Sequence, residues 1–185
     1  MHPPETRLWQ PSEEFQKNSN LSHFINWLRQ YRNLSFASYD QLWKWSTDEF
    51  ETFWQILLDY FHIQFDGHYS QVISTHNMPG VRWFEGIRLN YSEHIFRNAT
   101  GSRPAIIASS ESGRQSVISW NELKRQVTVL QHFLKKSGIQ KGDRVVGFLP
   151  NIPEATVALL ATNSLGAIWS GCSPDFGTQA VADRF

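Results

Sequence analysis

The fold is decided by three segments that follow one another along the chain: Arg144-Val-Val-Gly-Phe-Leu149, Pro153-Glu-Ala-Thr-Val-Ala-Leu-Leu-Ala161 and Ala167-Ile-Trp169. The first and third are short apolar runs, which are typical of buried strands. The middle segment begins with proline, which favours the first turn of a helix, and is apolar nearly all round. A strand, a helix and a strand in this order predict two parallel strands joined by a right-handed crossover.

The residues on either side of this unit extend the alternation. Upstream, Ala105–Ser109 and Val117–Trp120 flank a polar turn and predict a hairpin. Ser119 and Glu122 have the spacing of a capping box, and the helix that they open has one apolar face, formed by Leu123, Val127, Leu130 and Leu134. Gly138 is expected just after the end of that helix, and a further helix begins at Thr178. We therefore predict an α/β fold, with a parallel sheet covered on both faces by helices.

The first half of the chain has a different texture, because it is rich in aromatic residues and amphipathic. One apolar stripe, formed by Leu21, Phe24, Ile25 and Leu28, predicts a short helix. Ser46 and Glu49 have capping-box spacing and predict a helix over Phe50 to Phe61. Another helix is expected from Tyr91. Turn-forming residues from Asn98 to Pro104 place the predicted boundary between a mostly helical region, 1–100, and a second domain that starts at 101.

Composition excludes several classes of protein. The chain has 17 basic and 17 acidic residues, and this balance argues against a nucleic-acid partner. A single cysteine excludes an internal disulfide and a multi-cysteine zinc site. The longest apolar stretch, Val157 to Trp169, is interrupted by polar residues and is shorter than the ~18 residues of a membrane span. Met1 to Phe15 lack the apolar core of a secretory signal, so we expect an intracellular protein without a membrane partner.

Two weak motifs have simpler explanations. Gly142 and Gly147 have the glycine spacing of a phosphate-binding loop, but phenylalanine and leucine follow where that loop needs lysine and a hydroxyl residue. Gly142 is therefore interpreted as a turn before a strand. His62 and His68 lie near Asp66, but no third ligand has suitable spacing, so a solvated turn is favoured over a metal site.

One segment, Trp169-Ser-Gly-Cys-Ser-Pro-Asp-Phe-Gly177, concentrates turn formers and polar groups at the carboxyl end of a predicted strand. Open α/β sheets bind their ligands at that edge. We therefore predict a binding loop whose candidate residues are Trp169, Cys172, Ser173 and Asp175. The alternative is an ordinary strand-to-helix loop in which Ser173 or Asp175 caps the following helix.

Several strings together resemble the amino-terminal part of the acetoacetyl-CoA synthetases, a branch of the adenylate-forming acyl-CoA ligases. They are Ser38-Tyr-Asp-Gln-Leu-Trp-Lys-Trp-Ser46, Arg82-Trp-Phe-Glu-Gly86, Leu89-Asn-Tyr-Ser-Glu-His94, Gly142-Asp-Arg-Val145, Pro150-Asn-Ile-Pro-Glu-Ala155, Gly166-Ala-Ile-Trp-Ser170 and Cys172-Ser-Pro-Asp-Phe-Gly177. The Leu89-Asn-Tyr and Cys172-to-Gly177 strings are specific to the acetoacetate branch and differ from the acetate branch.

This resemblance implies an N-terminal cap region over 1–100 and the first strand–helix–strand units of the large ligase domain over 101–185. It implies cytosolic ATP-dependent activation of acetoacetate, with Mg²⁺ screening the phosphates, followed by transfer to CoA in lipid and ketone-body metabolism. The family's lysine-bearing phosphate loop, its nucleotide-binding motifs and its catalytic lysine lie downstream of the matched strings. We therefore expect no catalytic, ATP-binding or metal-binding residue, and no ligase activity, in residues 1–185 alone, and we expect the loop over 169–177 to lie towards the acyl and CoA channel.

Alternatives remain open at this point. The chain could be part of an acetyl- or propionyl-CoA synthetase, which the branch-specific strings disfavour. It could also be a complete, non-catalytic product that acts as a binding piece. An unpaired edge of the predicted parallel sheet invites partner strands, so the isolated chain is expected to self-associate and to be poorly soluble.

Overall fold

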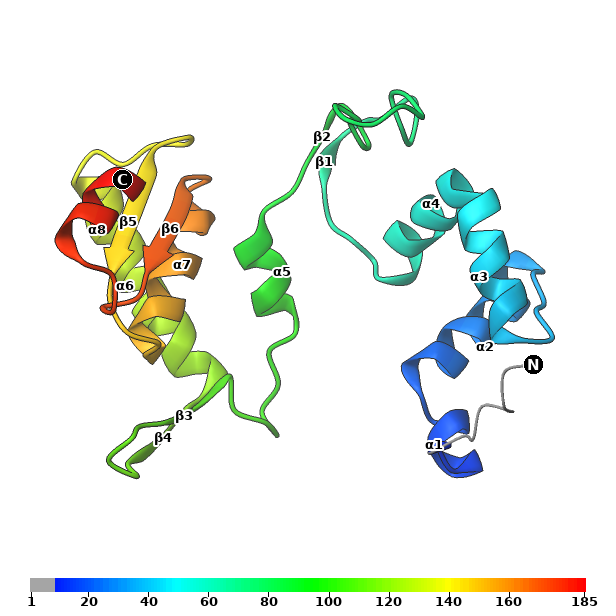
Figure 1. Cartoon of the computed structure of the whole chain (residues 1–185), viewed down its shortest axis with the longest axis horizontal. Helices are drawn as coiled ribbons and strands as arrows, with labels where there is room; N and C mark the ends of the chain where they lie inside the picture. Colours follow the sequence, from blue (N-terminus) through cyan, green and yellow to red (C-terminus); the bar gives the residue numbers. More distant parts are fainter. Residues whose placement is uncertain (1–8) are drawn as a thin grey trace, which may run out of the picture. The chain divides into compact units, whose positions relative to one another are not determined.

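The computed structural model describes residues 9–185, which form two compact units joined by short stretches of chain (Figure 1). The N-terminal unit comprises the described residues up to Ile63 together with Gly67–Ile87. The C-terminal unit comprises Gln64–Asp66 and Arg88–Phe185. Residues 1–8 lie outside the described residues. They include the beginning of the predicted N-terminal region and part of the segment that was considered as a secretory signal.

Helices make up most of the N-terminal unit, in the order α1 (Glu13–Lys17), α2 (Asn20–Arg32), α3 (Tyr39–Asp48) and α4 (Phe50–Tyr60). Serine side chains cap the first three of them: Ser12, Ser19 and Ser38 each accept a hydrogen bond from a backbone N–H in the first turn. The helix predicted from the Leu21–Leu28 stripe is α2, and its Phe24 and Leu28 are buried. They form one core with Leu42 of α3 and Ile56 of α4.

Aromatic side chains surround this core and explain the composition of the first half. Phe24 packs edge-on against Tyr60, with 4.8 Å between ring centroids, and Trp27 packs against the same ring at 5.2 Å. The guanidinium of Arg32 lies 4.9 Å from the Trp27 ring centroid and pairs with Asp59. These contacts hold α2 against α4.

The capping box predicted at Ser46 and Glu49 is wrong. Residue 46 lies inside α3, where its hydroxyl donates to the Trp43 carbonyl oxygen, 2.8 Å away. The N-cap of α4 is Glu49, which makes no side-chain capping bond. A helix had already begun at Tyr39, because Ser38 caps it and Leu42 packs in the core, and that helix continues through the second Ser-x-x-Glu pattern.

Two glycines shape the segment that follows α4. Short strands β1 (Asp66–Gly67) and β2 (Ile87–Arg88) form a two-stranded sheet. Gly67 and Gly86 have φ values of +94° and +101°, which favour glycine. A Cβ atom on Gly67 would overlap the Gly86 carbonyl oxygen, and one on Gly86 would overlap the carbonyl oxygen of His68. Only glycine therefore lets these two backbone segments approach each other.

The C-terminal unit contains α5 (Tyr91–Arg97), the hairpin β3 (Ile106–Ser109) and β4 (Gln115–Ile118), and α6 (Trp120–Lys136). It continues with β5 (Arg144–Phe148), α7 (Pro153–Ser164), β6 (Ile168–Cys172) and α8 (Thr178–Arg184). The hairpin is antiparallel, and β5 pairs with β6 in parallel from Arg144 and Ile168 to Phe148 and Cys172. The predicted hairpin and the predicted strand–helix–strand unit are both confirmed.

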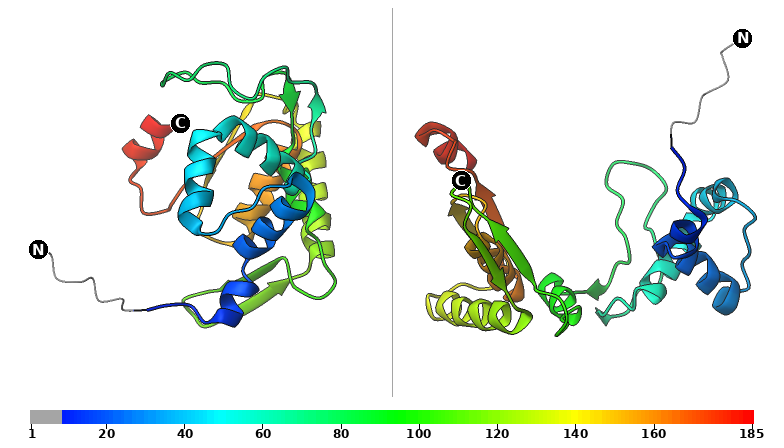
Figure 2. Two further views of the ribbon diagram at one scale, coloured as in Figure 1. Left: turned by 90° about the vertical axis from the view of Figure 1, so that its right-hand side faces the viewer. Right: turned by 90° about the horizontal axis from the view of Figure 1, so that it is seen from below.

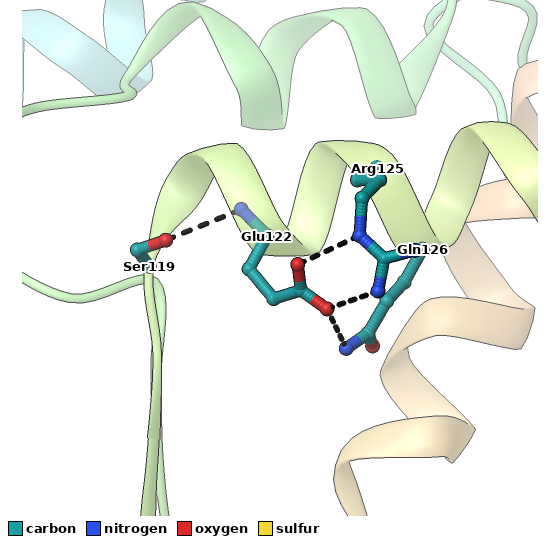
Figure 3. Close-up of polar contacts among 4 residues, drawn as sticks. All are labelled: Ser119, Glu122, Arg125 and Gln126. Atoms are coloured by element: carbon teal, nitrogen blue, oxygen red, sulfur yellow. Dashed lines mark hydrogen bonds and ion pairs between the residues drawn. The ribbon is translucent and has the colours of Figure 1, made fainter.

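Both ends of α6 are capped. Ser119 accepts a hydrogen bond from the Glu122 N–H, as predicted, but the Glu122 carboxylate turns away to Arg125 and Gln126 (Figure 3). These hydrogen bonds, first that of Arg125 and then that of Gln126, lower the pKa of Glu122 from 4.5 to about 2. At the other end Gly138 has φ +93°, and the Ile139 N–H donates to the Leu134 carbonyl oxygen at 3.1 Å. This is a Schellman ending, as the position of the glycine predicts.

The lowered pKa makes a prediction for acid stability. An ionised Glu122 favours the folded chain, so its contribution is present above pH 4.5 and is lost as the pH falls through about 2. We expect the wild type to melt above the Glu122→Gln variant at neutral pH, with the difference in Tm vanishing towards pH 2. Circular dichroism melts across this range test it, with Glu111→Gln in the β3–β4 turn as control. A difference that persists unchanged at pH 2 would contradict the assignment.

The core of the C-terminal unit lies between α6 and α7, where Leu123 and Val127 meet Val157, Leu160 and Ala161. Helix α5 packs on α7 as well: the buried Ser92 hydroxyl donates to the Leu160 carbonyl oxygen at 2.7 Å. Because of this packing, α5 belongs to the C-terminal unit, and the two compact units divide between Ile87 and Arg88, before the predicted turn. The assignment of 1–100 and 101–185 to two family regions remains a prediction.

One face of the β5–β6 pair is open within residues 9–185. Register places Val146 and Phe148 on the same face as Ile168, and each of these side chains is about half exposed. Figure 2 shows α7 alongside the pair, and α6 packs on α7 rather than on the sheet. The expectation of helices on both faces is therefore not met by the described residues.

Candidate functional site

The carboxyl ends of β5 and β6 meet at one edge of the sheet. Phe148 ends β5 and is paired with Cys172, which ends β6. The Leu149 N–H then donates to the Cys172 carbonyl oxygen at 3.3 Å, so the pairing runs one residue further. Beyond this edge the chain continues through Pro150 and Asn151 after β5 and through Ser173 after β6.

A cavity of about 290 Å³ lies at this edge. Its lining combines small residues with a few larger apolar side chains and two polar ones: Gly147, Leu149, Pro150, Asn151, Ala155, Trp169, Gly171, Cys172 and Ser173. We call it the edge pocket. In an open α/β sheet the crevice outside the carboxyl ends of the strands is the usual place for a ligand. Three predicted site residues, Trp169, Cys172 and Ser173, are thus brought together around one cavity.

Trp169 forms one wall of the edge pocket. It lies within β6, three residues before the strand ends, whereas the sequence predicted it as the last residue of the strand. Its indole covers Gly147 of the neighbouring strand: a Cβ atom at position 147 would lie 2.5 Å from Cη2 and 2.8 Å from Cζ2 of the ring, and would overlap Cδ2 of Leu149. The glycine is buried beneath the indole and gives it room to lie on the sheet.

Cys172 is the last residue of β6 and is 8% exposed, so the predicted binding loop loses its first four residues to the strand. Ser173 and Asp175 form a small turn after it. The Ser173 hydroxyl donates to Oδ2 of Asp175 at 2.7 Å. The lining of the edge pocket does not include Asp175.

The alternative explanation of this loop, that Ser173 or Asp175 caps the next helix, is wrong. The N-cap of α8 is Gly177, and no side chain caps that helix. The loop polar groups bond to each other instead.

The residues from the β5–α7 connection were missed by sequence reasoning. Leu149, Pro150 and Asn151, with Ala155 from the first turn of α7, complete the edge pocket. Parallel strands place their carboxyl ends at the same edge of a sheet. The predicted parallel pair therefore already implies that the residues after β5 lie beside those after β6.

The other motifs supply no site among the described residues. Gly142 has φ +89° and forms the turn before β5, while Gly147 lies inside that strand, so the two do not make a phosphate loop. Residues 9–185 contain no group of three or more His, Cys, Asp or Glu side chains that could hold a metal ion. In the same part of the chain, no helix is long and apolar enough to cross a bilayer.

Two family models match consecutive parts of the chain. A family described as "Acetyl-coenzyme A synthetase N-terminus" matches residues 39–95, and one described as "AMP-binding enzyme" matches residues 95–185. The part of the chain over residues 95–185 belongs to the AMP-binding enzyme family. The edge pocket, with β5, α7 and β6, lies entirely within the part that matches the AMP-binding enzymes.

Individual relatives in the AMP-binding enzyme family refine the comparison. The acetoacetyl-coenzyme A synthetase of Rhizobium meliloti (strain 1021) is 39% identical over 181 residues, 98% of this chain and 28% of the relative. The structure of acetoacetyl-CoA synthetase from Streptomyces lividans matches with a TM-score of 0.90 and 39% identity, covering 96% of this chain and 28% of that one. The malonamoyl-CoA synthetase vrtB of Penicillium aethiopicum is 32% identical over 187 residues, 97% of this chain and 26% of the relative.

These matches confirm the resemblance to the acetoacetyl-CoA synthetase branch and favour it over the acetyl- and propionyl-CoA alternative. The chain spans little more than a quarter of the length of these relatives.

Proposed function

We propose that this chain is the amino-terminal part of an AMP-forming acid–thiol ligase that acts on acetoacetate. In the first step a carboxylate oxygen of acetoacetate attacks the α-phosphorus of ATP and pyrophosphate leaves. In the second step the CoA thiolate attacks the acyl carbon and AMP leaves. The observation that carries the proposal is the 39% identity to an acetoacetyl-coenzyme A synthetase over 98% of the chain.

The named relatives narrow the class of acid. Acetoacetyl and malonamoyl groups are both short acyl groups with a second carbonyl two carbons from the first. The relatives named for them match this chain over nearly its whole length. This supports a short acid with a carbonyl at the β position as the substrate class.

The edge pocket is our candidate for the part of the acyl and CoA channel that this chain contributes, through Trp169, Cys172 and Ser173. Asp175 acts there by holding the Ser173 hydroxyl. ATP, CoA and Mg²⁺ belong to the proposal for the longer protein. Residues 9–185 offer no ligand set for a metal ion, so we assign Mg²⁺, the nucleotide and the catalytic step to no residue described.

We further propose that the protein is located in the cytosol and that its partners are small molecules, with no nucleic acid and no membrane among them. We also propose that the isolated chain self-associates. The outer edges of β5 and β6 have no partner strand among residues 9–185, which supports pairing with another copy.

Release of AMP tests the proposal. The longer open reading frame, expressed and purified, is expected to form AMP from ATP and CoA fastest with acetoacetate, more slowly with acetate or propionate. Residues 1–185 alone, as the matched control, are expected to form none. A longer product that forms no AMP with acetoacetate would overturn the proposal, and equal turnover of the three acids would overturn the choice of substrate.

A further inference from the structure

The Trp169 indole presents an unused hydrogen-bond donor at the edge pocket. Its Nε1 is the atom nearest to a Cβ placed on Gly171, at 3.6 Å, and Gly171 itself lines the pocket. Within residues 9–185 no acceptor bonds to this N–H. The side chain is partly exposed, so the N–H is available to a bound molecule.

The surroundings of that donor are mostly apolar. Leu149, Pro150 and Ala155 line the same pocket, from the β5–α7 connection and from α7, and no charged residue is among the lining. A cavity of about 290 Å³ with such walls admits a thin chain and disfavours a charged group. A single neutral donor in apolar surroundings favours a carbonyl oxygen, which accepts one hydrogen bond without bringing charge.

We propose that the edge pocket binds a thin carbonyl-bearing chain, whose carbonyl oxygen accepts a hydrogen bond from Nε1 of Trp169. Gly147 is the positioning residue, because a Cβ atom at position 147 would overlap both the indole and the Leu149 side chain, the two walls of the pocket beside it. This inference deepens the proposed function and rests on it for the source of the chain. Two sources share the chemistry: the β-carbonyl acyl group of the acid and the amide carbonyls of the pantetheine arm of CoA.

Nuclear magnetic resonance of the 185-residue chain, at a concentration below that at which it self-associates, tests the hydrogen bond directly. The indole N–H signal of Trp169 is assigned by its loss in Trp169→Phe, a change that keeps an aromatic ring and removes the donor. Acetoacetate is compared with butyrate, which has the same length without the keto oxygen. Desulfo-CoA is compared with adenosine 3′,5′-bisphosphate, which lacks the arm. The signal is expected to move with acetoacetate or desulfo-CoA and to stay in place with both controls.

The two arms of this experiment identify the source. A shift with acetoacetate alone assigns the pocket to the acyl group, and a shift with desulfo-CoA alone assigns it to the pantetheine arm. No shift with either compound, or the same shift with butyrate as with acetoacetate, overturns the proposal.

Cys172 provides a second, independent measurement. It is the only cysteine of the chain and lines the edge pocket, so its alkylation by iodoacetamide, read by intact mass, reports occupancy. The ligand that moves the indole signal should slow alkylation, and Trp169→Phe should need a roughly three- to tenfold higher ligand concentration for the same protection, the worth of one neutral hydrogen bond. Trp120→Phe, in the same unit but outside the pocket lining, is the matched control. Equal protection in the wild type and Trp169→Phe would overturn the role of the donor.

Gly147→Ala tests the positioning role. The added methyl group is expected to shift the Trp169 signal without ligand and to abolish protection of Cys172, while the Trp120 signal stays in place. An unmoved Trp169 signal in this variant would overturn the role of Gly147. The outcomes are separate from those of the AMP assay: a ligase with an unmoved indole signal would contradict this inference alone, and a moved signal without AMP release would contradict the proposed function alone.

Discussion

Replacing Leu28 by alanine is expected to lower the free energy of unfolding of the N-terminal unit by about 2–5 kcal/mol. The side chain is completely buried, at 0% exposed, and packs with Phe24, Leu42 and Ile56 between α2, α3 and α4. Deleting its methyl groups removes apolar contacts and leaves a void that these rigid aromatic surroundings cannot fill. Urea unfolding followed by tryptophan fluorescence measures it, because all the tryptophans except Trp120 and Trp169 belong to that unit.

Leu21→Ala is the matched control, since Leu21 lies on the same helix and is 42% exposed. It should cost much less than Leu28→Ala. If the two variants unfolded at the same urea concentration, the assignment of Leu28 to the centre of the core would be wrong.

Replacing Gly86 by alanine is expected to cost on the order of 3–4 kcal/mol, because two penalties act together. The φ value of +101° is strained for alanine, and the new Cβ would overlap the His68 carbonyl oxygen. A backbone carbonyl cannot rotate out of the way as a flexible side chain can, so the two segments must separate. The same unfolding experiment measures the loss.

Gly80→Ala separates the two penalties. Gly80 has a similar φ of +97°, but a Cβ at that position meets nothing within 4 Å. It should cost only about 1–2 kcal/mol, the strain of the dihedral angle alone. Equal costs for Gly80→Ala and Gly86→Ala would show that the close approach of the backbone contributes nothing.

The elements that sequence patterns predicted well are those whose signals are local. The hairpin, β5, α7 and the Gly138 ending of α6 each depend on residues adjacent in the chain. The capping pattern at Ser46 failed for the complementary reason. Whether a Ser-x-x-Glu run starts a helix depends on whether a helix is already in progress, and here the packing of Leu42 carries α3 through it.

The placement of α5 and the open face of the sheet were beyond local patterns. The helix predicted from Tyr91 is confirmed, and Asn90 caps it locally. Tyr91–Arg97 shows no clear apolar period, however, and its packing on α7 involves the hydrogen bond from Ser92 to a carbonyl of that helix, far away in the chain. The coverage of Val146, Phe148 and Ile168 depends on where α6 packs, and its apolar face meets α7 instead.

For the candidate site, the segment that sequence reasoning selected supplies four of the nine residues that line the edge pocket. Trp169, Cys172 and Ser173 were predicted because they follow a strand with unusual turn chemistry. Gly147 was not, since its role exists only in the register between β5 and β6, which brings the ring of Trp169 over it. That register could not be derived from either strand alone.

Because the Trp169 indole lies on Gly147, substitutions at these two positions are coupled. A side chain at 147 would overlap the indole and also Cδ2 of Leu149, so it becomes acceptable only when the side chains at 169 and 149 both leave that space. Their effects are therefore not additive, and each substitution determines whether the other is tolerated. An evolutionary path to a larger residue at 147 has to change residues 169 and 149 first, because the opposite order passes through an overpacked sheet.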